Sequence, residues 1–160
     1  MAKKPAGAST SSSSAVTKVL DMLKENSVEY VDLRFTDPRG KWQHTAQHIS
    51  TIDEDVFRDG IMFDGSSIAG WKAINESDMI LMLDPDTCVM DPFSAKPQAI
   101  IICDIIEPST GQPYTRDPRG TAKKAEAYVK ASGVGDACFF GPEAEFFVFD
   151  NVKFGTGGNY

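Results

Sequence analysis

The sequence predicts an α+β fold in which an N-terminal helix covers a sheet and no βαβ repeat occurs. Three observations support this prediction. Apolar residues near the N-terminus recur at helical spacing, short strand-like segments then follow one another up to about residue 106, and proline or glycine separates most of them. The 160 residues suffice for one domain, or for one small domain and the start of another.

The first helix is expected to follow a disordered, serine-rich tail over residues 1–14. Either Ser13 or Ser14 can cap it. Its apolar positions have the i, i+3, i+4, i+7 spacing of a helix that packs on a sheet, and they are Val16, Val19, Leu20 and Leu23.

A β-hairpin is expected next. Residues 30–35 alternate between polar and apolar side chains, and residues 41–49 return as the partner strand. The sequence Asp-Pro-Arg-Gly at residues 37–40 is typical of the turn between them.

A short helix over residues 53–58 is expected after the hairpin, with Ser50 or Thr51 as its cap. Further strands, separated by Pro85, Pro92 and Pro97, are expected over residues 79–83, 87–90 and 99–106. These elements form the first unit, residues 15–113.

A second unit is expected over residues 114–160. Asp117 and Pro118 are typical of a helix start, and Gly133 is typical of a helix end. The apolar stripe of this helix is Ala122, Ala125, Tyr128 and Val129, and strands are expected over residues 137–140 and 143–150. One helix and two strands cannot enclose a core, so only the truncated start of this unit is expected here.

The bulk composition excludes several classes of partner. The net charge is −7 without a cluster of basic residues, which argues against nucleic acid and anionic membranes as partners. No apolar run is long enough to cross a bilayer. The three cysteines, Cys88, Cys103 and Cys138, are an odd number at spacings that suit no disulfide framework, so we expect buried free thiols in a reducing cytoplasm.

The segment from Met62 to Met79 has the composition of a specific, ordered loop. It combines two glycines and three serines with Asp64, Trp71 and a second acidic pair, Glu76 and Asp78, and it fits neither helical nor strand periodicity. Glycines permit a tight turn that would hold Asp64 and Trp71 in fixed places. The residues alone also allow an ordinary solvated surface loop.

Two glutamates near the C-terminus form a candidate metal site. Glu143 and Glu145 would point to the same face of a strand, with Cα atoms roughly 6–7 Å apart. Phenylalanines on both sides predict a buried strand, where paired carboxylates need a cation, and oxygen ligands favour Mg²⁺ or Mn²⁺. Two acids cannot complete an octahedral shell, and a bare Glu-x-Glu is also compatible with solvated acids.

The two histidines are weaker candidates. His44 and His48 have metal-like spacing only on a helix, whereas they lie in an expected strand. We therefore expect exposed strand residues.

Four segments, in order, resemble the bacterial type I glutamine synthetase family. They are VDLRFTDPRGKWQHTAQHI, FDGSSIAGWKAINESDM, CDIIEPSTGQPYTRDPRG and GPEAEFFVFD. The resemblance implies a β-grasp N-terminal domain, followed by a catalytic domain built on a curved antiparallel sheet. It also implies a homo-oligomer of two stacked six-membered rings, with each active site between the catalytic domain of one subunit and the N-terminal domain of its neighbour.

The resemblance further implies a reaction and roles for individual residues. Members of the family join glutamate and ammonium at the expense of ATP, through a γ-glutamyl phosphate. Asp64 matches the acid that binds ammonium and removes its proton, and Glu143 and Glu145 match ligands of two different divalent cations. Ser67 and Trp71 match residues that shape the loop, although Trp71 could equally be a packing residue.

The family's remaining metal, glutamate and nucleotide ligands would fall beyond Tyr160, so this chain alone is expected to be inactive. Two alternatives stay open: a non-catalytic ring-assembly module, and a related ligase that joins glutamate to another amine. The intact Asp64 loop favours ammonia over other amines.

Overall fold

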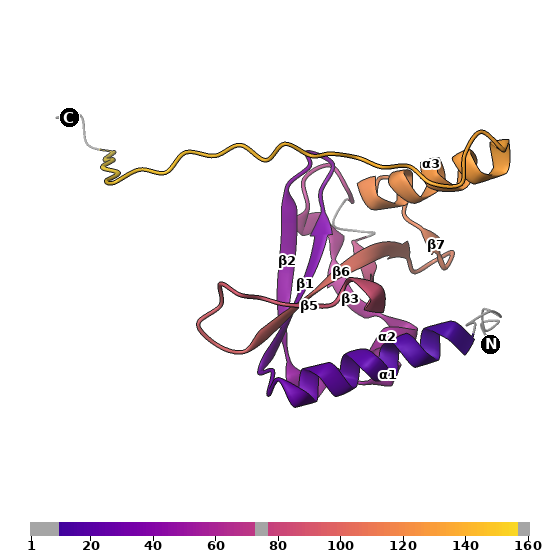
Figure 1. Ribbon diagram of the computed structural model, residues 1–160, viewed down its shortest axis with the longest axis horizontal. Coiled ribbons are helices and arrows are strands. Elements are labelled where there is room, and N and C mark those ends of the chain that lie inside the picture. The colour runs from indigo at the N-terminus through magenta and orange to yellow at the C-terminus, as the bar shows by residue number, and fades with distance from the viewer. Residues whose placement is uncertain (1–9, 73–76, 157–160) are drawn as a thin grey trace.

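The computed structural model describes residues 10–72 and 77–156, and within these residues seven strands form one mixed sheet (Figure 1). The strands are β1 (Tyr30–Thr36), β2 (Trp42–His48), β3 (Ile61–Asp64), β4 (Asp78–Leu83), β5 (Val89–Met90), β6 (Gln98–Glu107) and β7 (Gln112–Pro113). The helices are α1 (Thr10–Glu25), α2 (Glu54–Asp59) and α3 (Pro118–Ser132), and the short 3-10 turns are η1 (Ile49–Thr51), η2 (Gly65–Ser67) and η4 (Pro85–Thr87).

The strand order is β2-β1-β6-β4-β3, and β5 and β7 also pair with β6. The pair β1–β6 is parallel, whereas the other pairs are antiparallel. The predicted hairpin is confirmed, with Tyr30 opposite His48 and Thr36 opposite Trp42. This arrangement of one long central strand between two hairpin-like arms is the expected α+β architecture.

One face of the sheet carries the core, because alternate residues of the central strands point to it. Helix α1 adds Val19 and Leu23, as its spacing predicted. The strand residues of this cluster are at most 4% exposed, and they are Val31, Leu33, Phe35, Met79, Leu81, Leu83, Ala99, Ile101, Cys103 and Ile105.

Both N-terminal helices begin at other residues than predicted. Helix α1 starts at Thr10, so Thr10 to Ser14 are helical, and neither Ser13 nor Ser14 can cap it. Helix α2 is capped by Asp53, whose carboxylate accepts a hydrogen bond from the Val56 amide at 3.0 Å. The predicted caps of α2 belong instead to the preceding turn η1. Figure 1 shows α1 and α2 side by side at one end of the molecule.

Helix α3 has the predicted cap and end. Asp117 accepts a hydrogen bond from the Arg119 amide, and Gly133 follows in the left-handed conformation at φ 70°. The Arg119 guanidinium binds Asp104 at 2.7 Å and Asp84 at 2.5 Å, which holds the start of the helix on the sheet. None of the residues of α3 is fully buried, and of its predicted apolar stripe only Val129 is half-buried.

The strands predicted over residues 137–140 and 143–150 are wrong for this structure. Residues 134–156 contain no helix or strand, and Figure 1 shows the chain after α3 running past one end of the sheet and out beyond it in an extended path. A strand forms only where another strand takes its backbone hydrogen bonds, and no described strand pairs with this segment.

The cysteines are free, but only one is buried. Burial raises the pKa of the Cys103 thiol to about 12 and that of the half-buried Cys88 thiol to about 11. Cys138 is exposed, contrary to the prediction, because the segment around it has no partner strand.

Among the described residues, no helix has the length and apolar character needed to cross a bilayer.

Candidate functional site

The candidate site is the loop from Asp64 to Trp71, which follows directly from the edge strand β3. The segment Met62–Met79 was expected to fit no strand periodicity, but residues 62–64 belong to β3 and residues 78–79 belong to β4. Of its second acidic pair, Glu76 and Asp78, Glu76 lies outside the described residues. The loop itself opens with the 3-10 turn η2.

Asp64 is exposed and ends β3 as the cap of η2. Its Oδ1 accepts hydrogen bonds from the Ser66 hydroxyl at 2.6 Å and from the Ser66 amide at 2.8 Å. These bonds stabilise the charged form and lower the pKa of Asp64 below its ordinary 3.8. The loop therefore presents a fixed negative charge to solvent, which suits a small cation.

Gly65 fixes the loop against the neighbouring strand. Its amide donates to the Ser77 carbonyl at 2.7 Å, directly beyond the pair formed by Asp64 and Asp78. A Cβ at residue 65 would lie 2.6 Å from the Met79 side chain, so only glycine fits this approach.

Trp71 closes the loop and lies inside the core, where it is 4% exposed. Its ring contacts three others, with centroids at 5.5 Å from Phe35, 5.6 Å from Tyr114 and 6.1 Å from Phe63. This is the packing role that the sequence left open as one alternative. Its Nε1–H is buried and has no hydrogen-bond partner among the described residues.

The chain entering α3 contacts the same end of the loop. The Tyr114 hydroxyl donates to the Trp71 carbonyl at 2.8 Å, and Arg116 Nη1 donates to the Gly70 carbonyl at 2.6 Å. Lys72 forms an ion pair with Glu107 at 2.5 Å beside them. An open hollow of about 510 Å³ lies here, and its lining includes Trp71, Lys72, Glu107, Tyr114 and Arg116.

Sequence reasoning missed three of these residues. Ser66 could have been found, because a serine two residues after an aspartate is a common partner in a capping turn. Tyr114 and Arg116 gave no local signal, since their contacts reach across more than forty residues. Ser67, which the resemblance placed in the loop, is exposed on η2.

The two candidate metal ligands are not brought together with other ligands. Glu143 and Glu145 are exposed in a segment without secondary structure, so the predicted buried strand is wrong for this structure. Within residues 10–72 and 77–156, no cluster of three or more His, Cys, Asp or Glu side chains could hold a metal ion. The two carboxylates suit Mg²⁺ or Mn²⁺ in donor type but fall short in number.

The histidines are exposed strand residues, as predicted. His44 Nδ1 lies 2.7 Å from the buried carboxylate of Asp32, across the β1–β2 pair. His48 Nδ1 accepts a hydrogen bond from the Ser50 amide.

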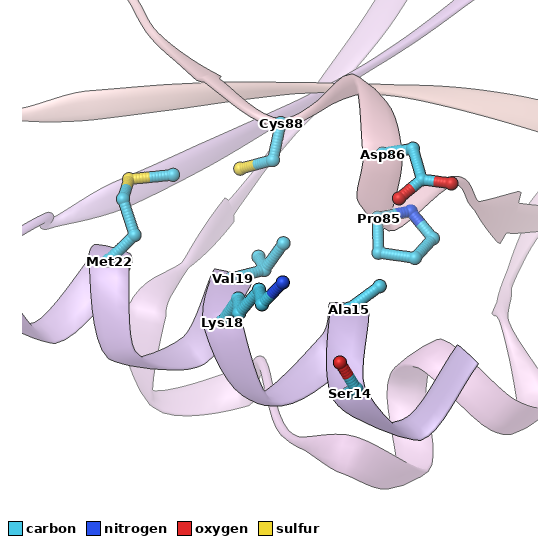
Figure 2. Close-up of a pocket in the computed structure, with 8 residues that line it drawn as sticks. All are labelled: Ser14, Ala15, Lys18, Val19, Met22, Pro85, Asp86 and Cys88. Carbon is cyan, nitrogen blue, oxygen red and sulfur yellow. The ribbon is translucent and has the colours of Figure 1, made fainter. Parts of the chain in front are cut away.

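A second hollow, of about 610 Å³, lies between α1 and η4 (Figure 2). Figure 2 shows Lys18, Val19 and Met22 of α1 facing Pro85 and Cys88 across it. It shares no residue with the Asp64 loop, and the raised pKa of Cys88 keeps that thiol protonated at neutral pH.

The chain matches the models of two domains of one protein family. Residues 27–108 match the glutamine synthetase β-grasp domain, and residues 115–160 match the glutamine synthetase catalytic domain. The chain therefore belongs to the glutamine synthetase family, and its N-terminal fold is the β-grasp that the sequence resemblance implied.

Curated relatives agree with this assignment. A glutamine synthetase of Azospirillum brasilense is 73% identical over 88% of this chain and 30% of its own length. One of Bradyrhizobium diazoefficiens is 67% identical over 86% of this chain and 29% of its own length. The chain thus spans less than a third of the relatives it matches.

Solved structures share the fold. Plasmodium falciparum glutamine synthetase aligns with a TM-score of 0.67 at 26% identity, over 82% of this chain and 24% of that one. A complex of GmaS with ADP aligns with a TM-score of 0.64 over 71% of this chain and 26% of that one; at 19% identity it supports the fold alone.

Proposed function

We propose that this chain forms the N-terminal part of an ATP-dependent glutamate–ammonia ligase that works through a γ-glutamyl phosphate. The relatives at 73% and 67% identity carry the name glutamine synthetase, and both domains of the family match in order along the chain. Because the chain spans about 30% of those relatives, the complete reaction requires residues that it does not contain.

The exposed carboxylate of Asp64, placed at the end of β3 and bonded to Ser66, is the observation that carries this proposal. It is exposed, it lies on a loop held at both ends, and hydrogen bonds from Ser66 lower its pKa. An anion in this position stabilises ammonium. It can also accept the ammonium proton, which must leave before the nitrogen attacks an acyl phosphate. Ser67 and Trp71 shape the same loop in this account.

Glu143 and Glu145 are proposed to hold divalent cations in the complete protein, one residue for each of two ions. Mg²⁺ or Mn²⁺ bound there would neutralise the charge of ATP phosphates. The additional ligands, and the partner strands that would order residues 137–150, would come from the part of the relatives that extends beyond this chain.

The domain division and the assembly belong to the same proposal. We assign residues 15–113 to the β-grasp domain and residues 114–160 to the start of the catalytic domain. The predicted tail over residues 1–14 is wrong for Thr10–Ser14, which belong to α1 and so go with the first domain. The complete protein is proposed to be a cytoplasmic homo-oligomer of two six-membered rings. In that assembly the Asp64 loop faces the active site of a neighbouring subunit.

A chimera tests the proposal. It joins residues 1–160 of this chain to the remaining C-terminal part of the Azospirillum brasilense relative. We expect the chimera to form glutamine from glutamate, ammonium and ATP, and the 160-residue chain alone to form none. An assembled but inactive chimera would favour the ring-assembly module, and preference for another amine would favour the related ligase.

The metal ligands are tested in the same chimera. Glu143→Gln and Glu145→Gln should each weaken Mn²⁺ binding by about tenfold or more, because each removes a charged oxygen ligand. The matched control is Glu126→Gln, which changes an exposed glutamate of α3 paired with Lys130. Mn²⁺ affinity that responds equally to all three changes would remove the two residues from the metal site.

A further inference from the structure

We infer that Tyr114 and Arg116 are positioning residues that hold the Asp64 loop, residues 64–71, in the geometry needed to bind ammonium. The inference rests on the proposed function, because it assigns these two side chains a task in the ammonium step. It concerns the far end of the loop, where the chain leaves the sheet pairing and needs other contacts to stay in place.

The near end of the loop is held by the sheet itself. Asp64 pairs with Asp78 across β3 and β4, and the Gly65 amide continues the pairing to the Ser77 carbonyl. Among residues 10–72 and 77–156, this pairing goes no further than Gly65. Inside the loop, Ile68 and Trp71 donate to the carbonyls three residues before them, which stabilises the turns but does not attach them to the sheet.

The far end is attached by side chains from the β7–α3 connection. The Trp71 carbonyl accepts the Tyr114 hydroxyl at 2.8 Å, in a buried position, while the two rings pack edge to face at 5.6 Å. Arg116 Nη1 donates to the adjacent Gly70 carbonyl at 2.6 Å. Gly70 has a φ of 86°, so this carbonyl's direction depends on a backbone conformation that glycine permits.

Tyr114 is itself held by strand and helix, which makes it a firm anchor. Its amide donates to the Ile105 carbonyl at 2.8 Å, and its carbonyl accepts from the Asp117 amide at 3.1 Å. Tyr114 is 8% exposed, whereas Arg116 is exposed to solvent. A buried hydrogen bond is worth more than an exposed one, so Tyr114 has the larger share of the positioning.

The consequence for Asp64 follows from the geometry of the loop. Phe63 packs against Trp71, and Asp64 is the next residue along the strand. A shift of Trp71 therefore displaces Phe63, and with it the backbone that positions the Asp64 carboxylate. Misplacement of a catalytic group by about 1 Å can cost up to about a hundredfold in rate.

Fluorescence of Trp71 in this chain is the first readout. The sequence has two tryptophans, so Trp42→Phe leaves Trp71 as the sole emitter. In that background, Tyr114→Phe keeps the ring but removes the hydroxyl, and it should raise the acrylamide quenching constant of Trp71. Tyr128→Phe is the matched control, since Tyr128 is 74% exposed on α3, and it should leave the quenching constant unchanged.

Ammonium kinetics in the chimera are the second readout. Tyr114→Phe should raise the KM for ammonium by about three- to tenfold, the scale of one lost buried hydrogen bond, and leave the KM for glutamate within about twofold. Arg116→Met should act in the same direction with about a twofold change, and it remains available if Tyr114→Phe does not fold.

Unchanged Trp71 quenching together with an unchanged ammonium response would overturn the inference. The inference would also fail if Asp64→Asn impaired ammonium use as expected but neither Tyr114→Phe nor Arg116→Met changed the KM for ammonium. That outcome would leave the proposed function intact. If Asp64→Asn is itself without effect on ammonium use, the proposed function fails and the inference fails with it.

Discussion

The carboxylate of Asp117 joins the central strand to helix α3 through Ile105. Its Oδ2 accepts a hydrogen bond from the Ile105 amide at 3.2 Å, while its Oδ1 accepts one from the Arg119 amide at 3.0 Å. Asp117 is 1% exposed, so these two amides replace the water that the carboxylate has lost. One side chain thus attaches the start of α3 to strand β6.

Burial of Asp117 predicts a stability change that depends on pH. Desolvation raises the pKa of this carboxyl above its ordinary 3.8, although the backbone hydrogen bonds oppose the shift. A raised pKa means that protonation favours the folded state, so this group's contribution to stability grows as pH falls through its folded pKa. Asp117→Asn should cost about 1–3 kcal/mol at about pH 7 and more at about pH 4. Urea unfolding at both pH values measures it, and a smaller cost at the lower pH would contradict the assignment.

The stability contributed by Asp37, in the hairpin turn, should have the opposite pH dependence. It accepts hydrogen bonds from Gln43 Nε2 and from the amides of Lys41 and Arg39, and these lower its pKa. A lowered pKa gives stability that is present above 3.8 and is lost as pH falls through the folded pKa. The loss of stability on Asp37→Asn should therefore be larger at about pH 7 than at about pH 2. Equal losses at the two pH values would show that the charge of Asp37 plays no part.

Two glycine substitutions should change the unfolding free energy in opposite directions. Gly65→Ala places a Cβ at 2.6 Å from Met79 and 3.0 Å from the Ser77 carbonyl, and it should cost about 1–3 kcal/mol of unfolding free energy. Gly120→Ala, inside α3, meets nothing closer than 3.6 Å and should stabilise by about 0.5–1 kcal/mol. Thermal unfolding of the two variants and of the parent chain measures both changes in stability. Stabilisation by Gly65→Ala would mean that the loop is free to move away from β4.

Local sequence patterns predicted the elements whose stability comes from local periodicity. The hairpin of β1 and β2 and the central strand β6 follow the alternation of buried and exposed residues, and Asp117 and Gly133 bound α3 as expected. The cap of α2 was predicted wrongly because several capping residues occur together before it. Asp53 takes the role since its carboxylate alone reaches the Val56 amide.

Contacts between distant segments could not be predicted from the sequence. The strands expected over residues 137–150 depend on partners that no local pattern reveals, and the described chain supplies none. The bond from Tyr114 to Trp71 spans 43 residues, so neither segment signals the other. The Asp64 loop itself was recognised through its unusual composition and its resemblance to a family, rather than through periodicity.

The charge of Asp64 is the centre of this account, and Asp64→Asn in the chimera tests it. Asparagine caps a helical turn as well as aspartate does, so η2 and the assembly should be preserved. The matched control is Asp53→Asn, which changes the exposed cap of α2 in the same way, outside the loop.

The decisive measurement is an ammonium saturation curve for each chimera, taken with sedimentation of the same preparation. We expect Asp64→Asn to lower ammonium-dependent efficiency by roughly ten- to a hundredfold, with intact assemblies and little change in phosphorylation of glutamate. Asp53→Asn should leave the curve unchanged. Intact assemblies whose ammonium response is the same for Asp64→Asn and for the parent chimera would contradict the account.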